Sequence, residues 1–194
     1  MDGMEMCKQL KSDGRTSHIP IIILTAKADK DSRLEGLKTG ADDYLIKPFD
    51  AEGLKVRVDN LIDQRKKLRE KYRKEFLTGL DDIQLIPPDE RFLLKVSETI
   101  QEHLQDPAFN IENLSHEIGL SRSQLYRKIM AISGFTTTEY LRNIRLKHAE
   151  SLFLEKQSNI AQVAYQVGFS NPSYFSECFK ELFGKSPSEY IKSI

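Results

Sequence analysis

Two segments in the C-terminal half of the chain repeat each other, and this repeat constrains the fold more than any other feature. Ile111-x-x-Leu-Ser-x-x-Ile-Gly-Leu-Ser121 matches Ile160-x-x-Val-Ala-x-x-Val-Gly-Phe-Ser170 at an offset of 49 residues (160 − 111). Further on, the segment 134–141 matches the segment 184–191 at an offset of 50 (184 − 134). The repeat predicts two copies of one supersecondary unit, with one additional residue just after Ser170.

Each copy carries the signals of two helices joined by a tight turn. A short helix ends at a glycine, Gly119 or Gly168, where positive φ is needed. One apolar residue follows, and then a serine, Ser121 or Ser170, which is a good N-cap for a second helix. This pattern predicts a helix-turn-helix in each copy. An αα-hairpin that serves only for packing is the alternative, and the presence of two matching copies argues against it.

The second helix of each copy has one apolar face and one polar face. At about 100° per residue, the core-facing positions are Leu125, Ile129 and Ile132, then Phe175, Phe179 and Leu182. Arginine can pair with guanine, glutamine with adenine, and glutamate with cytosine, so the opposite face is a candidate for reading bases. Any surface helix also has a polar face, which is the plainer interpretation. The candidate DNA-binding residues are Arg122, Ser123, Gln124, Tyr126, Arg127, Ser173, Tyr174, Ser176, Glu177 and Lys180.

Between the copies, residues 138–154 form an uninterrupted amphipathic pattern. A helix of this length spans about 25 Å and can hold two recognition helices about one turn of DNA apart, so that they enter two successive major grooves. Arg142 and Arg145 lie on it and are predicted to meet phosphates, with a purely solvated role as the alternative.

Residues 89–194 resemble the double helix-turn-helix DNA-binding domain of AraC-type transcription regulators. The segment 160–190 is closest to the family signature, and the first helix of the domain would be 91–104. Two departures affect packing: Phe135 is followed by three threonines where a Ser-Pro is expected, and Ile129-Met130 replaces Phe-Lys. The resemblance implies a sequence-specific transcription regulator that binds double-stranded DNA. A homodimer is also expected, through self-association of residues 1–76.

The N-terminal part of the chain contains β signals. Residues 21–24 are a continuous apolar run, as expected for a strand that is covered on both faces. A helix is predicted over 30–39, ending at Gly40, and a second strand over 44–46. Thr25 and Lys47 then stand at the ends of the two strands, where open α/β sheets bind ligands, and together they suggest an anion site.

Leu24-Thr-Ala26, Gly40-Ala-Asp-Asp-Tyr44 and Lys47-Pro-Phe49 resemble the second half of a response-regulator receiver domain. The resemblance implies that Thr25 and Lys47 contact a phosphoryl group and that Tyr44 rotates on activation. The phosphoacceptor aspartate is expected to be absent from this chain, because Asp2, Asp42 and Asp43 do not match its position. A complete receiver would use Mg²⁺, and no cofactor is expected here. A cognate histidine kinase, or a kinase domain upstream, is the implied partner.

A charged helix is predicted after the receiver segment. Leu54, Leu61 and Leu68 recur every seven residues, with Val58 and Tyr72 beside them. This spacing predicts a short coiled coil, which Arg65 interrupts; a single exposed helix is the alternative. Because strands are missing, the receiver segment is expected to be disordered, or to be rescued by dimerisation or strand exchange.

The predicted fold is mostly α: a truncated α/β, flavodoxin-like receiver remnant at 1–62, a helical extension and linker at 63–88, and an all-α double helix-turn-helix domain at 89–194. Lys plus Arg equals Asp plus Glu at 29 each, so any DNA contact must come from a local patch. Residues 85–194 carry 12 basic and 13 acidic side chains, which favours the alternative of a protein-interaction module without DNA binding.

Two function classes are disfavoured. The four histidines lack ligand spacing and no nucleophile–base pair is evident, so an enzyme is not expected. The longest apolar run, residues 19–26, is too short to span a membrane, so this segment is expected to make no membrane contact and to be cytoplasmic. Cys7 and Cys178 are expected to be free thiols.

Overall fold

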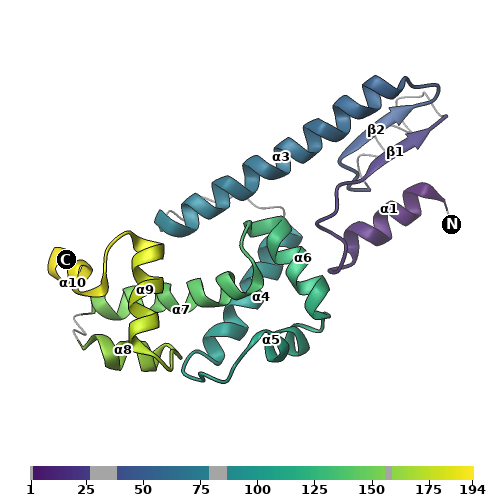
Figure 1. The fold of residues 1–194 in the computed structure, drawn as a ribbon. Coiled ribbons are helices and arrows are strands. Elements are labelled where there is room, and N and C mark those ends of the chain that lie inside the picture. The colour runs from purple at the N-terminus through teal and green to yellow at the C-terminus, as the bar shows by residue number, and fades with distance from the viewer. Residues whose placement is uncertain (1, 27–38, 79–86, 156–158) are drawn as a thin grey trace.

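The computed structural model describes residues 2–26, 39–78, 87–155 and 159–194. The chain is mostly helical, with a small sheet at one end and a bundle of helices at the other (Figure 1). This is the predicted fold class. The helix predicted over 30–39 lies almost entirely outside the described residues. No helix in the described ranges is both long and apolar enough to cross a bilayer.

Within its described residues, the receiver segment contains one helix and two paired strands. Helix α1 is Gly3–Ser12, strand β1 is Ile22–Thr25 and strand β2 is Asp43–Ile46. The strands are parallel, with Ile22 opposite Asp43 and Thr25 opposite Ile46. Both strands were predicted to within one residue. The described part of the segment has regular secondary structure, where disorder was one of the expectations.

Helix α3 (Ala51–Thr78) connects the two parts of the molecule without a break. It leaves the sheet and runs alongside the C-terminal helices (Figure 1). The predicted boundary between residues 62 and 63 therefore falls inside one helix. At its far end, Tyr72 is buried and Phe76 packs against the same core. Tyr72 was assigned to a coiled-coil seam, and that assignment is wrong because its ring is covered by the C-terminal helices of this same chain.

The C-terminal region contains seven helices between residues 87 and 194, within the described ranges. They are α4 (Pro87–Glu102), α5 (Ile111–Ile118), α6 (Arg122–Ser133), α7 (Thr137–Leu154), α8 (Ile160–Gln166), α9 (Pro172–Phe183) and α10 (Pro187–Ser193). Two hydrophobic cores stabilise them. The first joins α4, α5, α6, the start of α7 and the end of α3, and the second joins the rest of α7 with α8, α9 and α10.

The repeated turns have the predicted backbone. Gly119 and Gly168 both have positive φ, at 77° and 78°. Ser121 caps α6 as expected. In the second copy, however, the N-cap of α9 is Asn171 and not Ser170. The additional residue after Ser170 moves the cap one position along the chain, and Pro172 then fills the first helical position, where no backbone N–H is required.

Candidate DNA-binding surface

Helix α6 is fixed at its start by a capping box. The Gln124 backbone N–H donates to Ser121 Oγ at 3.3 Å, and the Ser121 N–H donates to Gln124 Oε1 at 2.9 Å. This satisfies two backbone donors that would otherwise lack partners. Leu125 and Ile129 are fully buried, as predicted. The Gln124 side chain is partly occupied by the capping box, so it is the least available of the predicted base-reading residues on this helix.

The opposite face of α6 is open to solvent. Arg122, Ser123 and Arg127 are exposed, and Tyr126 retains 45% of its accessible surface. Arg127 Nε donates to the Ser123 carbonyl at 3.2 Å, which holds the arginine along the helix. A groove of about 760 Å³ lies between these four side chains and the N-terminal turn of α7 at residues 136–138. The face predicted to read bases is therefore accessible.

Helix α9 presents the equivalent face in the second copy. Asn171 Oδ1 accepts from the backbone N–H groups of Ser173 and Tyr174, at 2.8 and 3.2 Å. Phe175 and Phe179 are fully buried, and their rings contact Phe153 of α7. Four of the predicted residues are exposed on the outward side: Ser173, Tyr174, Glu177 and Lys180. The fifth, Ser176, is half-buried, and its hydroxyl donates to the Pro172 carbonyl at 2.9 Å.

The two arginines of α7 do not lie free on the surface. Arg142 points to α9, where Nη2 is 3.2 Å from Glu181 Oε2, and its side chain is 22% exposed. Arg145 is 8% exposed and donates to three backbone carbonyls, at Asp106, Phe109 and Gly168. The predicted phosphate contact by Arg145 is wrong, because its guanidinium is used inside the domain. The phosphate contact by Arg142 stays a prediction.

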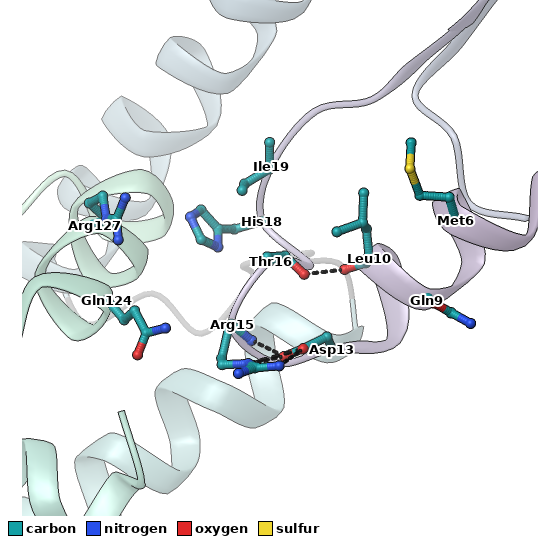
Figure 2. Close-up of a pocket in the computed structure, with 10 residues that line it drawn as sticks. All are labelled: Met6, Gln9, Leu10, Asp13, Arg15, Thr16, His18, Ile19, Gln124 and Arg127. Atoms are coloured by element: carbon teal, nitrogen blue, oxygen red, sulfur yellow. Dashed lines mark hydrogen bonds and ion pairs between the residues drawn. The ribbon is translucent and has the colours of Figure 1, made fainter. Parts of the chain in front are cut away.

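The receiver segment lies directly beside α6. A cavity of about 610 Å³ is walled on one side by α1 and the loop that follows it, and on the other side by Gln124 and Arg127. Figure 2 shows both of these side chains facing the loop that carries Arg15 and His18. Arg15 is itself held by Asp13, with Nη2 2.5 Å from Oδ2. One flank of the candidate recognition helix is therefore covered by the receiver segment.

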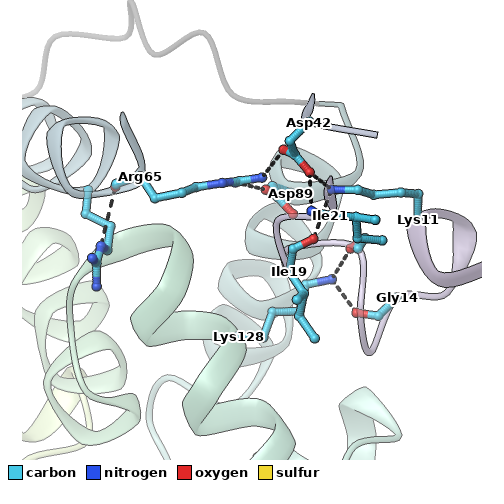
Figure 3. A network of polar contacts seen from close by, with 10 residues as sticks. Lys11, Gly14, Ile19, Ile21, Asp42, Arg65, Asp89 and Lys128 are labelled. Carbon is cyan, nitrogen blue, oxygen red and sulfur yellow. Dashed lines mark hydrogen bonds and ion pairs between the residues drawn. The ribbon is translucent and has the colours of Figure 1, made fainter. Parts of the chain in front are cut away.

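A polar network joins the two parts of the molecule at this place (Figure 3). Lys128, on α6, donates to Ser17 Oγ at 3.1 Å and to the Gly14 carbonyl. Its Nζ also lies 4.2 Å from the centre of the Phe92 ring of α4. Although it is a lysine, only 1% of its surface is exposed. Lys128 thus ties the receiver loop to the recognition helix.

Arg65 makes the second connection. From the middle of α3 it reaches Asp42, just before β2, at 3.4 Å and Asp89, in the first turn of α4, at 3.5 Å. Lys11 of α1 is also 2.5 Å from Asp42. Arg65 therefore bridges a carboxylate of the receiver segment and a carboxylate of the helical region. It is the same residue that interrupts the predicted heptad pattern of α3.

Burial shifts the protonation equilibria of these groups. Burial raises the pKa of Asp89, and the nearby Arg65 and Lys128 oppose that shift. Burial lowers the pKa of Lys128, and the carboxylates of Asp89 and Asp13 oppose it. His18 has its pKa lowered to about 4, first by burial and then by the cations around it. Burial thus disfavours the charged forms of Asp89, Lys128 and His18, and neighbouring opposite charges counter this effect for Asp89 and Lys128.

Two of the three predicted receiver switch residues, Thr25 and Lys47, lie at one end of the sheet, whereas Tyr44 lies within β2 opposite Ile23. Thr25 ends β1, and Lys47 directly follows β2, with the Lys47 N–H donating to the Thr25 carbonyl at 2.6 Å. Tyr44 is buried in β2. Asp42 and Asp43 do not extend this site, because Asp43 is held by Arg57 at 2.8 Å and Asp42 by Lys11 and Arg65. The structure thus places Thr25 and Lys47 at adjacent strand ends, as predicted.

Lys128 is the important residue that sequence reasoning missed. It lies next to Ile129 and three residues after Leu125, which places it beside the apolar stripe of α6. A charged side chain at the border of a core-facing stripe is a signal for a specific tertiary partner, because an unpaired buried charge is costly. Arg65, in the apolar seam of α3, gives the same signal.

Comparison with known proteins supports the division of this chain into a receiver segment and a helix-turn-helix region. The response regulator receiver domain family matches residues 1–59, and the helix-turn-helix domain family matches residues 114–193. The chain contains the end of a response-regulator receiver domain followed by an AraC-type helix-turn-helix domain. A solved AraC-type regulator from Chromobacterium violaceum has the same helical fold, with a TM-score of 0.51 and 22% identity, over 56% of this chain and 96% of that one.

Two curated relatives match this receiver–helix-turn-helix chain over most of its length. Histidine kinase P4 of Formosa agariphila is 37% identical over 190 residues, which is 98% of this chain and 14% of that protein. The transcriptional regulatory protein SpaR of Bacillus subtilis is 32% identical over 161 residues, or 77% of this chain and 67% of that protein. The chain therefore corresponds to a small part of one relative and about two thirds of the other.

The described part of the receiver segment does not offer a fitting site for the Mg²⁺ that a complete receiver would use. Asp42 and Asp43 are both neutralised by cations. In the described ranges, the one cluster of potential metal ligands is Glu102, His103 and Glu117, which lies in the helix-turn-helix domain. There the His103 ring stacks on Phe109, and Nε2 is 3.0 Å from Glu117. No step that depends on a metal follows from this arrangement.

Proposed function

We propose that this chain is the DNA-binding output of a two-component signalling system and acts as a sequence-specific transcription regulator. The observation that carries the proposal is the pair of capped helices α6 and α9, each buried on one face and open on the other. The membership of the AraC-type family supports the same function. The relative that is a histidine kinase supports an origin at the output end of a hybrid sensor, with a kinase domain as the signalling partner.

The proposal includes the reading of two successive major grooves by one monomer. Helix α7 has 18 residues and spans about 27 Å at 1.5 Å per residue. It separates two units whose recognition helices would have to lie about 34 Å apart to meet successive grooves on one side of the duplex. The length of α7 is of the same order as this separation, which supports the proposal.

Base reading is assigned to the exposed residues of the two helices. In α6 these are Arg122, Ser123, Tyr126 and Arg127, and in α9 they are Ser173, Tyr174, Glu177 and Lys180. Arg127 is placed centrally, opposite the buried Leu125 and Ile129, so it can offer a bidentate fork to a guanine. The balanced charge of the region means that affinity comes from this local surface and not from a general positive field.

A binding-site selection with purified protein tests the proposal. The expected result is enrichment of one bipartite motif, with affinity that falls as salt increases and with far weaker binding to unrelated duplexes. A matched control is the double variant Ser123→Glu and Arg127→Glu, which adds negative charge to the outward face without touching the core. The alternative of a protein-interaction module would instead yield no enriched sequence, and the double variant would then bind DNA as poorly as the parent.

A further inference from the structure

Arg145 occupies the junction between the two helix-turn-helix units. It lies near the middle of α7, and its guanidinium is directed away from solvent. Nη2 donates to the Asp106 carbonyl at 2.7 Å and to the Phe109 carbonyl at 3.4 Å, both in the loop between α4 and α5. Nη1 donates to the Gly168 carbonyl at 3.1 Å, in the turn between α8 and α9. One side chain thus holds the backbone of both units.

The same junction requires a glycine at position 168. A Cβ at Gly168 would lie 2.4 Å from the Leu104 carbonyl oxygen and 2.9 Å from Arg145 Cζ. The positive φ of Gly168 adds a second reason, because side chains rarely adopt it. Leu104, just after α4 and before the first unit's helix-turn-helix, packs its side chain into the core of the second unit. The backbones of the two units are therefore in direct contact, and Arg145 is the polar connection between them.

The chemistry of arginine suits this position. Its guanidinium is planar, keeps its charge when buried and offers donors in fixed directions. Burial lowers the pKa of Arg145, which Asp106 opposes, and backbone carbonyls supply the solvation that water would otherwise provide. Because a buried charge with misdirected partners is costly, the three carbonyls can take only a narrow range of relative positions. Arg145 therefore restricts both the distance and the rotation between the units.

We propose that Arg145 is a positioning residue that sets the spacing between the two DNA half-sites that one monomer reads. The inference rests on the proposed function for its consequence on DNA, and on the contacts above for its mechanism. Arg145 acts through the orientation of α6 and α9, and it touches no DNA itself. One added base pair moves a half-site by about 3.4 Å and rotates it by about 35°, so a rigid junction should reject it.

The first test measures the relative position of the units without DNA. Spin labels are placed on Ser123→Cys in α6 and Ser173→Cys in α9, which are exposed, whereas the native Cys7 and Cys178 are buried. The parent should give one narrow distance distribution, and Arg145→Lys, which keeps the charge but loses the fork, should give a clearly broader one. An unchanged distribution in Arg145→Lys would overturn the proposal, whether or not the protein binds DNA.

The second test measures spacing preference on duplexes whose half-sites are one or two base pairs closer or further apart. The parent should lose about ten-fold or more in affinity for a change of one base pair. Arg145→Lys should lose less than about three-fold, with unchanged salt dependence, because no phosphate contact is removed. His148→Gln, at an exposed position on the same helix, is the matched control and should keep the parent's spacing preference.

If Arg145→Lys does not fold, Gly168→Ala supplies the same information, because it displaces the units while Arg145 stays in place. It should shift or broaden the distance distribution and change the preferred spacing. Retention of the parent's spacing by a folded Arg145→Lys or Gly168→Ala would contradict the proposal. Failure of the parent to select any DNA sequence would contradict the proposed function and the DNA part of this inference, while the distance measurement would still decide the role of Arg145 in the junction.

Discussion

The hydroxyl groups of Tyr72 and Tyr140 lie 3.3 Å apart and hydrogen bond inside the first core of the DNA-binding region. Tyr72 comes from the last turns of α3, and Tyr140 from the first turns of α7. Ser97 of α4 completes the arrangement, with Oγ 3.1 Å from the Tyr140 hydroxyl. The helix that begins at the receiver segment thus ends as part of the structure that supports α6.

Truncation of Tyr72 should destabilise the DNA-binding region. Tyr72→Ala leaves a cavity where a large buried ring was, and we expect it to lower the free energy of unfolding by about 3–5 kcal/mol. Tyr72→Phe removes only the hydroxyl, while Tyr140 keeps Ser97, and should cost about 0.5–1.5 kcal/mol. Urea unfolding checks both values. Tyr126→Ala, on the exposed face of α6, is the control, and a similar loss there would contradict the assignment.

Arg127→Ala should change sequence preference without changing the fold. Loss of a bidentate base contact costs about 1–3 kcal/mol of discrimination, or about 5- to 150-fold. The melting temperature should be unchanged, because the Arg127 side chain is exposed. Binding-site selection with the variant should relax one base position in the half-site read by α6. A uniform loss of affinity for all sequences would show that Arg127 meets phosphate instead.

Lys128→Met should loosen the contact between the receiver loop and α6. The methionine fills the same space but cannot donate to Ser17 and Gly14. We expect faster amide hydrogen exchange in residues 13–19, with little change in the buried part of α9. Lys95→Met, an exposed lysine on α4, is the matched control. Equal protection of residues 13–19 in both variants would mean that Lys128 does not hold the loop.

The stability of the folded chain should depend on pH through His18. Its pKa is lowered to about 4 by burial and by Lys128, Arg65, Arg127 and Lys11, against about 6.5 in an unfolded chain. Between these two pKa values the unfolded state binds more protons than the folded state. The contribution of neutral His18 to the free energy of unfolding is therefore complete above pH 6.5 and is lost as the pH falls toward 4. Because the His18 ring is partly exposed, we expect this loss of stability to be on the order of 1 kcal/mol. His18→Gln should remove this slope, as thermal unfolding at pH 7.5 and pH 5 will measure.

Self-association through the receiver side is the fifth prediction. Val56, Val58 and Ile62 of α3 are all more than a third exposed, near the end of α3 that carries the sheet. A second copy of the chain is the expected occupant, in line with the expected homodimer. Light scattering should give a dimer for the parent at micromolar concentration and a monomer for Ile62→Lys. Lys66→Glu, one turn further along, is the control that should stay dimeric.

Local signals in the sequence predicted the elements that depend on local physics. Gly119 and Ser121 mark a turn whose conformation follows from the backbone of glycine and the hydroxyl of serine, so the turn could be placed without tertiary information. Leu125 and Phe175 follow from helical periodicity. The cap at Asn171 was missed by one residue, because the repeat was aligned by similarity and the additional residue falls inside the turn itself.

The roles of Arg145, Lys128 and Arg65 depend on tertiary packing and could not be predicted in this way. Helix α7 lies between two cores and is buried on most sides, so the assumption of one buried and one solvated face fails for it. Arg145 was therefore assigned to the surface because it is charged. Lys128 and Arg65 meet partners more than 20 residues away, and nothing in their own helices specifies those partners.

The unbroken course of α3 has a consequence for exchanging receivers between proteins of this architecture. Arg65 and Tyr72 are separated by seven residues, and they contact α4 and α7 only while the helix keeps its rotational phase. Insertion of one residue between them would turn one end against the other by about 100° and displace it by about 1.5 Å, which would separate Arg65 from Asp89 or Tyr72 from Tyr140. A transplanted receiver must therefore be joined in helical register, and a graft that changes this count would disconnect it from the helices that it contacts.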